Sequence, residues 1–585
     1  MSATQELDEP TSTTAEHAPE AVGVSGAVLL LRSLKSHGVE RIFANIGTDY
    51  APVVEALAVC RVGGEAVPEL VLCQHENIAM SAAHGCAAAT GELQVVFVHA
   101  DVGTQNIGGA MHNASRARVP VLVIAGLSPY TTRGEMTGSR SAAVQFLQDV
   151  PVQSGIVHQY TAWIGEARTA VNIPQVVARA VHVARSTPGV AYLTMAREPL
   201  EELTNPVGAE VLPRLRATVP DAATLDELAT WLREADIPLA ITGATGRDPK
   251  GADALARLAD VSGLGVLEAE PYTWTNLATD DPHHLGAMPS ELLGDADLVL
   301  ALNVDVPWVP ALQQPAPSAR VALVDADPLK HHIPMADIAA HLFAGGSPSA
   351  TLDLLTERLT AEPVAPARLD ARRQWVRAAR AERTDEVQGR LRADREAQRL
   401  TPLTIAAALD AALGDEAVVL HEAVSSARST ITQLRRGAGR RFFGSGGGSL
   451  GWCLGAAFGM RLALGLDTVA IMGDGTFVFG NPTAAFWGAR RYGAPFLAVV
   501  LNNAGWNAVG RATVQQHPLG VAATSGELCS SFGAPSDLGL VAQASGGSAW
   551  SIDRLEDLPA ALSEAIAATR TGTAAVVDVR MEAAS

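Results

Sequence analysis

The chain has 585 residues, a formal net charge of −19 at pH 7 and a hydrophobic content of 48%. One hydrophobic core rarely organises so long a chain, so roughly two to four domains are expected. The acidic balance argues against nucleic-acid binding, which needs a basic face. The sequence contains no run of about 20 apolar residues, so no membrane span is predicted. Five scattered cysteines without a C-x-x-C pair indicate a reduced, cytoplasmic protein.

Residues 1–22 are rich in Glu, Thr, Ala and Pro and lack an apolar run. They predict a disordered tail and no signal peptide. In residues 23–205, amphipathic helical stretches alternate with short apolar runs such as 95–98 and 121–124. Helices that alternate with buried strands are typical of a parallel sheet. This segment is therefore predicted to form a first α/β domain.

A second α/β domain is predicted for residues 215–360, which contain the apolar runs 298–302 and 321–325. Its Gly243-x-x-Gly246 pattern indicates a tight turn, because the G-x-G-x-x-G spacing of a dinucleotide site is missing. Near its end, the run Lys330-His331-His332 favours a solvated turn over a polyphosphate contact.

Residues 361–400 are dominated by Ala, Arg and Glu, and they predict an exposed helical connector. Residues 401–580 alternate helix and strand again, so they predict a domain that resembles the first one. The predicted fold class is therefore α/β with three domains, each a mostly parallel sheet flanked by helices.

Two short motifs in the third domain carry the strongest chemical signal. Gly473-Asp474-Gly475 follows an apolar strand and precedes a helix, and Asn502-Asn503-Ala504-Gly505 follows the next apolar strand. Both lie at the carboxyl ends of predicted parallel strands, where α/β proteins bind ligands. Free N–H groups at a helix start suit a phosphate, and Asp, Asn and carbonyl oxygens suit Mg²⁺. A lone G-D-G is usually only a turn, but the pair predicts a metal and diphosphate site.

These paired motifs resemble those of the thiamine-diphosphate enzymes that include acetolactate synthase, benzoylformate decarboxylase and 2-hydroxyacyl-CoA lyase. The resemblance covers residues 23–579 and implies a pyrimidine-binding domain, a central domain and a diphosphate-binding domain. It implies that Mg²⁺ is held by Asp474, the Asn503 side chain and the Gly505 carbonyl. Contacts to the diphosphate are implied for Gly473, Gly475 and Thr476, and for Ser425 and Ser426.

The glycine-rich stretch from Gly446 to Trp452 also resembles the family pattern. By this match, Leu450 lies under the cofactor and imposes its bent shape. The Gly448 carbonyl accepts a hydrogen bond from the amino group of the aminopyrimidine. Without the resemblance, the glycines would indicate only a flexible loop.

Glu76, in His75-Glu76-Asn77-Ile78-Ala79, stands at a predicted helix start, where an acid often merely complements the helix dipole. The resemblance implies more, because this pattern marks the family's cofactor-activating glutamate. Such an acid promotes the imino tautomer of the cofactor, which then deprotonates thiazolium C2 to the ylide. In the family, this glutamate and the Mg²⁺ site of one centre belong to different chains. A homodimer or homotetramer is therefore expected, and His75 is expected to pack.

The substrate pocket is less well defined by the sequence. Its predicted residues are Thr48, Tyr50, His112, Phe146 and Trp506. No ready proton donor follows Gly505, which favours carboligation or C–C cleavage over simple decarboxylation. The leading hypothesis is an acetolactate synthase-like enzyme that acts on a 2-oxo acid through the C2 ylide and an enamine. The alternatives are a 2-hydroxyacyl-CoA lyase, a 2-oxo acid decarboxylase and a non-catalytic cofactor-binding subunit. FAD is not expected, because Gly286-Ala287-Met288-Pro289 replaces the flavin motif of acetolactate synthases.

Overall fold

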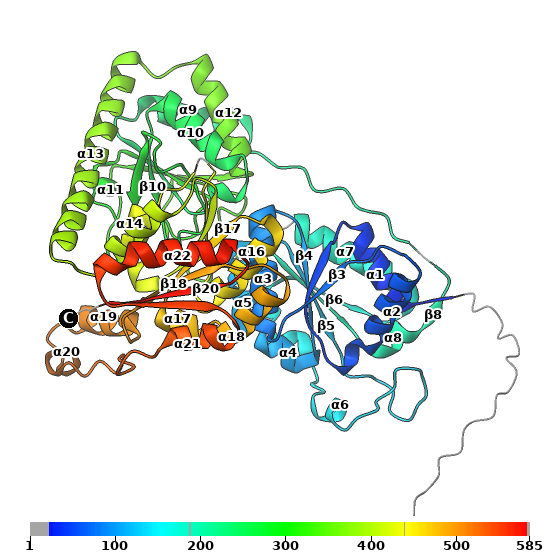
Figure 1. The fold of residues 1–585 in the computed structure, drawn as a ribbon. Helices are drawn as coiled ribbons and strands as arrows, with labels where there is room; N and C mark the ends of the chain where they lie inside the picture. Colours follow the sequence, from blue (N-terminus) through cyan, green and yellow to red (C-terminus); the bar gives the residue numbers. More distant parts are fainter. Residues whose placement is uncertain (1–22, 187–188, 207, 438, 582–585) are drawn as a thin grey trace, which may run out of the picture.

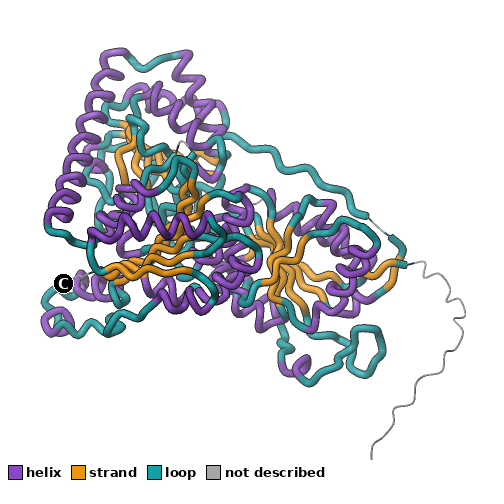
Figure 2. The backbone as a smooth tube through the Cα atoms, viewed as in Figure 1, coloured by secondary structure: helices purple, strands orange, loops and turns teal. Residues whose placement is uncertain are grey.

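The computed structural model of the chain describes residues 23–186, 189–206, 208–437 and 439–581. The predicted tail at 1–22 lies outside these residues. Each of three domains is built on one six-stranded parallel sheet with helices on its faces (Figures 1 and 2). This architecture confirms the predicted α/β fold class. No helix in the described ranges is both long and apolar enough to cross a bilayer.

The first domain has the strand order β3-β2-β4-β5-β7-β6, and its central strands β4 and β5 are completely buried. Buried strands of this kind need helices on both faces of the sheet. A short antiparallel pair, β1 (Val24–Ser25) with β8 (Leu203–Thr204), ties the ends of the domain together. Its strands are β2 (Arg41–Asn45), β3 (Glu69–Leu72), β4 (Gln94–Val98), β5 (Val121–Gly126), β6 (Thr161–Ala167) and β7 (Val190–Met195), and its helices are α1 (Gly26–Ser36), α2 (Ala51–Val62), α3 (Glu76–Thr90), α4 (Ala100–Asn106), α5 (Gly108–Ala117), α6 (Val144–Leu147), α7 (Ile173–Ser186) and α8 (Arg197–Glu201).

The central domain has the order β11-β10-β9-β12-β13-β14, a doubly wound sheet. Its elements are α9 (Ala222–Glu234), β9 (Pro238–Thr242), α10 (Gly251–Ser262), β10 (Gly265–Glu268), β11 (His284–Ala287), α11 (Leu292–Asp295), β12 (Leu298–Leu302), β13 (Arg320–Asp325), β14 (Leu342–Gly345) and α12 (Pro348–Ala361).

The long helix α13 (Pro366–Glu396) follows the central domain and runs along its side (Figure 1). Most of it is exposed, and its buried residues are Arg372, Val376, Ala379 and Leu391. Arg372 is buried, and it donates to the carbonyls of Ser262 and Ala235. The helix is therefore a packed wall of the central domain.

The third domain has the order β16-β15-β17-β18-β20-β19, which repeats the topology of the first and confirms their predicted similarity. Its strands are β15 (Ala417–Glu422), β16 (Arg441–Gly444), β17 (Asp467–Gly473), β18 (Leu497–Asn502), β19 (Ser548–Ile552) and β20 (Ala575–Arg580), and its helices are α14 (Pro402–Ala412), α15 (Ala427–Gln433), α16 (Trp452–Leu464), α17 (Asp474–Phe479), α18 (Pro482–Arg491), α19 (Asn507–Gln516), α20 (Val521–Ser525), α21 (Leu538–Ala544) and α22 (Leu558–Arg570).

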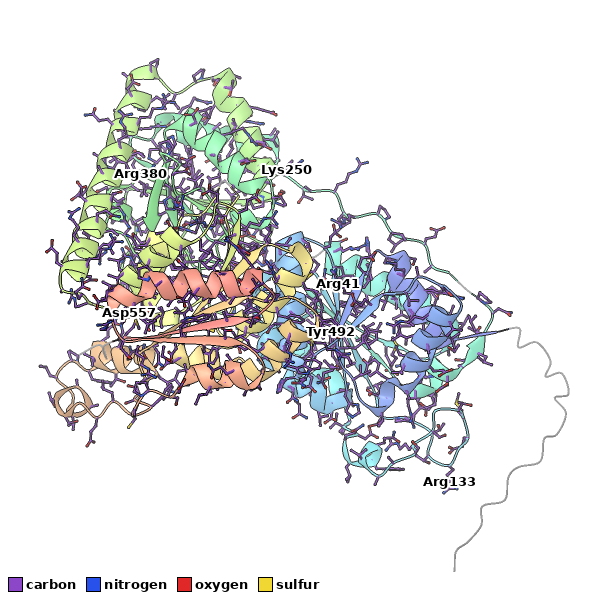
Figure 3. All side chains as sticks on the ribbon, viewed as in Figure 1. Arg41, Arg133, Lys250, Arg380, Tyr492 and Asp557 are labelled. Atoms are coloured by element: carbon purple, nitrogen blue, oxygen red, sulfur yellow. The ribbon has the colours of Figure 1, made fainter. Side chains whose placement is uncertain are left out.

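Helices α3 and α16 join the first and third domains through small residues. A Cβ atom on Gly459 would lie 2.2 Å from the carbonyl oxygen of Ala82, and one on Gly85 would lie 2.6 Å from that of Ala456. Only glycine allows backbones to approach this closely. The Tyr492 hydroxyl, labelled in Figure 3, adds a second link by accepting a hydrogen bond from Leu72 N at 2.7 Å.

An ion-pair cluster joins the first and central domains. Lys330 is only 2% exposed, and its Nζ lies 2.5 Å from Asp325 Oδ2 and 3.2 Å from Asp305 Oδ1. Arg118, at the end of α5, lies 2.7 Å from the same Asp305. The prediction of a solvated turn is therefore wrong for Lys330, because carboxylates at the ends of central strands neutralise it in the interface.

Candidate active site

A cavity of about 300 Å³ opens at the carboxyl edge of the third sheet, between β15, β17 and β18. Loops from strand ends that are distant in sequence meet here, as expected for a parallel sheet. Every predicted site residue of the third domain lines it, namely Ser425, Ser426, Gly448, Leu450, Gly473, Asp474, Gly475, Thr476, Asn503, Gly505 and Trp506.

Asp474 is the buried acid of this cavity. Its Oδ1 accepts from Gly475 N at 2.9 Å, and its Oδ2 accepts from Gly505 N at 3.1 Å. Asn503 Oδ1 accepts from the same Gly505 N at 3.1 Å. The carboxylate and the amide oxygen thus converge on one backbone group.

Asp474 has no ion-pair partner in the part of the chain that the structure describes, and burial raises the pKa of its carboxyl. A buried carboxylate without a counter-charge, next to an amide oxygen, is a good fit for a hard divalent cation. The residues present therefore fit Mg²⁺.

Asn502 shapes the turn that carries Asn503. Its Nδ2 donates to Asp578 Oδ1 on β20 at 2.9 Å, and its Oδ1 accepts from Ala504 N at 3.2 Å. Asn502 is therefore a buried structural residue, and Asn503 faces the cavity.

Gly473 and Gly475 differ in the space beside them. A Cβ atom on Gly473 would meet nothing within 4 Å, so this backbone borders open space. A Cβ atom on Gly475 would lie 2.2 Å from the ring of Trp506, so the indole covers that glycine closely. Trp506 is 38% exposed and packs edge-on against Phe532, with ring centroids 5.0 Å apart. The open space therefore lies on the Gly473 side, where backbone N–H groups at the start of a helix suit a phosphate.

The loop that carries Leu450 is anchored on both sides. On the first-domain side, Gly448 N donates to His112 Nε2 at 3.1 Å, and Asn113 exchanges two hydrogen bonds with Ser449. On the other side, the Glu422 carboxyl accepts from Trp452 N at 3.3 Å and Cys453 N at 2.8 Å. Burial raises the pKa of Glu422 to about 8. Leu450 is therefore held at the cavity wall by contacts that sequence reasoning did not identify.

His112, predicted for the substrate pocket, is not among the residues that line the cavity of its own chain. Its Nε2 accepts from Gly448 N, and its ring packs edge-on against Tyr160. Because that nitrogen accepts a hydrogen bond, the imidazole is neutral. His112 supports the glycine-rich loop of its own chain.

Glu76 is the first residue of α3 and is 8% exposed. Its Oε2 accepts from Asn106 Nδ2 at 3.1 Å. It does not line the cavity of its own chain. His75 caps this helix, since its Nδ1 accepts from Asn77 N at 3.1 Å.

The other predicted pocket residues lie apart from the cavity. Tyr50 is 2% exposed, its hydroxyl donates to the Ile124 carbonyl at 2.6 Å, and its ring packs on Phe97, so placing it in a pocket is wrong. Phe146 lies on α6 below the first domain and is 52% exposed (Figure 1). Thr48 is exposed at the carboxyl end of β2.

Beside Thr48, the buried Asp49 carboxylate pairs with the partly buried His99, a pair that the sequence did not predict. Asp49 Oδ1 lies 2.6 Å from His99 Nδ1, and Gln148 Oε1 lies 3.0 Å from His99 Nε2. The hydrogen bond to Asp49 raises the pKa of His99. His99 directly precedes α4, whose Asn106 holds Glu76. The sequence contains one signal for His99, which directly follows the buried strand β4, at the sheet edge where α/β proteins bind ligands.

Known family models match the two domains that carry these residues. The model of the thiamine pyrophosphate enzyme N-terminal TPP binding domain matches residues 24–153, and that of the C-terminal TPP binding domain matches residues 424–579. Benzoylformate decarboxylase of Pseudomonas aeruginosa is 26% identical over 81% of this chain and 85% of its own length. The large subunit of acetolactate synthase isozyme 3 of Escherichia coli is 25% identical over 82% of each chain.

A solved structure shares the fold. The thiamine diphosphate-dependent 4-hydroxybenzoylformate decarboxylase of Rhodococcus jostii superposes with a TM-score of 0.76 at 19% identity, over 96% of this chain and 99% of its own. With both terminal domains matched, the chain belongs to the thiamine pyrophosphate (thiamine diphosphate) enzymes. Within that class, it is similar both to an acetolactate synthase and to a benzoylformate decarboxylase.

Proposed function

We propose that the protein uses thiamine diphosphate and Mg²⁺ to remove CO2 from a 2-oxo acid. The observation that carries this proposal is Asp474, a buried acid without a counter-charge whose oxygens converge with Asn503 on Gly505 N. Mg²⁺ would be held by Asp474, Asn503 and the Gly505 carbonyl, with the diphosphate along Gly473 to Thr476. When bound, thiamine diphosphate supplies a carbon nucleophile and a sink for the electron pair that CO2 leaves behind.

Glu76 would hold a proton at the aminopyrimidine nitrogen N1′. Because Glu76 does not line the cavity of its own chain, a second copy would supply it, in a homodimer or homotetramer. Exposed apolar side chains around the cavity support such a partner. Val424 and Val478 are each 60% exposed, Phe479 is 55% exposed and Val509 is 52% exposed. Apolar surface gathered at a site favours association.

His99 would donate the proton that replaces the lost carboxylate and releases an aldehyde. It shares the carboxyl edge of the first sheet with Glu76, and Asp49 favours its protonated form. A histidine whose protonated form is favoured by a neighbouring carboxylate is an effective acid. The sequence favours carboligation because no proton donor follows Gly505. With His99 as a donor, that reason is weaker.

Acetolactate synthase-like carboligation is the second candidate. Ala508 and Val509 line the cavity near Trp506 without a proton donor. An apolar wall there leaves space for a second 2-oxo acid as acceptor. The two reactions share the loss of CO2 and differ in whether a proton or a second carbonyl compound is then taken up.

The experiment is product analysis with the full chain, thiamine diphosphate and Mg²⁺. Pyruvate, 2-oxobutyrate and benzoylformate are each supplied, and CO2, aldehyde and 2-hydroxy ketone are measured; a 2-hydroxyacyl-CoA serves as the test of lyase activity. Decarboxylation predicts aldehyde, and carboligation predicts ketone. Glu76→Gln should keep cofactor binding by circular dichroism and lose about 10²–10⁴-fold in turnover. A failure to bind the cofactor, or undiminished turnover of Glu76→Gln, refutes the proposal.

A further inference from the structure

A second cavity, of about 390 Å³, lies between the central and third domains and shares no lining residue with the first. Helix α13 forms one wall, α15 and the residues after it form the other, and the edge strand β11 contributes a third side. Charged side chains dominate it: the arginines are Arg380, Arg383, Arg390, Arg428 and Arg436, and the glutamates are Glu291 and Glu386.

The arginines of α13 share one face of the helix. Arg380, Arg383, Val387 and Arg390 are spaced by three, four and three residues, which places them along one side. Arg380 points from α13 toward the central domain (Figure 3), where it donates to the Thr279 and Asp281 carbonyls. Arg383 donates to Ser290 Oγ at 2.7 Å and to the Ala287 carbonyl at 3.1 Å. This wall is therefore fixed in place before any ligand binds.

The positive charges of the cavity are incompletely neutralised. Arg436 is 4% exposed and lies 2.6 Å from the buried Glu268, yet its Nε and Nη1 have no hydrogen-bond partner among the described residues. Arg390 approaches Glu386 at 3.8 Å. Arg380, Arg383 and Arg428 have no carboxylate within ion-pair distance in the described ranges.

Two of these unpaired guanidinium groups influence each other. Burial, and next the charge of Arg428, lower the pKa of Arg383. The guanidinium group of Arg428 makes no hydrogen bond with a described residue, and the side chain is exposed on α15. Like charges placed on opposite walls of a cavity repel, and a bound anion removes that repulsion.

We propose that this cavity binds a small organic phosphate. Guanidinium groups bind phosphate oxygens through paired, charge-assisted hydrogen bonds. The hydroxyls of Thr384, Ser429 and Thr432 also line the cavity, and Leu285 and Ile431 add apolar surface for the organic part. A volume of about 390 Å³ is within the range of sites for ligands of this size.

The test is calorimetric titration of the full chain, with the cofactor cavity first saturated by thiamine diphosphate and Mg²⁺. ADP and inorganic phosphate are the anionic probes, and adenosine is the uncharged counterpart. We expect saturable binding of ADP that weakens with added salt, and no binding of adenosine.

Arg428→Gln should weaken ADP binding by roughly tenfold without affecting folding, because the side chain has no hydrogen bond to lose. Arg373→Gln is the matched control, since Arg373 lies on α13, outside the cavity, and pairs with Asp260 at 3.4 Å. Absence of saturable binding by both anions overturns the proposal. ADP binding that Arg428→Gln leaves unchanged also overturns the proposal. If Asp474→Asn then abolishes this binding, ADP occupies the cofactor cavity.

Discussion

The close contact between α3 and α16 decides whether an added methyl group at Gly459 stabilises or destabilises the protein. In Gly459→Ala, the new Cβ would lie 2.2 Å from the Ala82 carbonyl oxygen, where ordinary contact begins at 3.4 Å. Because the opposing atom is backbone, the two helices must separate by about 1 Å. Such overpacking costs roughly 1–3 kcal/mol, and the backbone contact places this case at the upper end. The higher helix propensity of alanine offsets about 1 kcal/mol.

We therefore expect Gly459→Ala to lose about 2 kcal/mol, which corresponds to a fall of roughly 4–8 °C in the unfolding temperature by scanning calorimetry. Thiamine diphosphate should also bind more weakly, because α16 begins directly after the Leu450 loop. Gly389→Ala is the control, since its Cβ on α13 would meet only the end of Arg392, at 3.9 Å. There alanine should be neutral or stabilising. An unchanged unfolding temperature for Gly459→Ala, or an equal fall for Gly389→Ala, would refute the reasoning.

Three further predictions concern charge at the site. Asp474→Asn removes the charge of the proposed cation site. Thiamine diphosphate with Mg²⁺ should then bind about 100-fold more weakly in a fluorescence titration and should no longer raise the unfolding temperature. Unchanged affinity contradicts the metal assignment. Asp49→Asn removes the partner that raises the pKa of His99. The protonated donor is then lost at lower pH, so the alkaline limb of the turnover profile should move to lower pH, and an unmoved limb argues against His99 as the acid. Glu422 is neutral in the fold up to a pKa of about 8, against an ordinary 4.5. Its contribution to stability is complete below pH 4.5 and is lost as pH rises through 8, so Glu422→Gln should flatten the pH dependence of unfolding of the cofactor-free protein.

The sequence alone determined the fold class and which residues of the third domain meet at the first cavity, because both depend on local patterns. Buried parallel strands are continuous apolar runs, and their order of helix and strand implies the sheet. Gly473 to Thr476 and Asn503 to Gly505 follow such strands directly. Since the carboxyl ends of neighbouring parallel strands meet at one edge, their convergence was predictable without coordinates.

Only the tertiary structure decided which polar residues face a cavity and which are buried supports. Tyr50 follows a strand end, yet its hydroxyl reaches the Ile124 carbonyl inside the domain. Lys330 looks solvated in the sequence but is neutralised by Asp305 and Asp325 between domains. Asp49 bonds to His99, which is about 50 positions away in the sequence. Arg383 and Arg428, about 45 positions apart, face each other across the second cavity. A charge acts through distance in space, and the local patterns of a single sequence do not contain that distance.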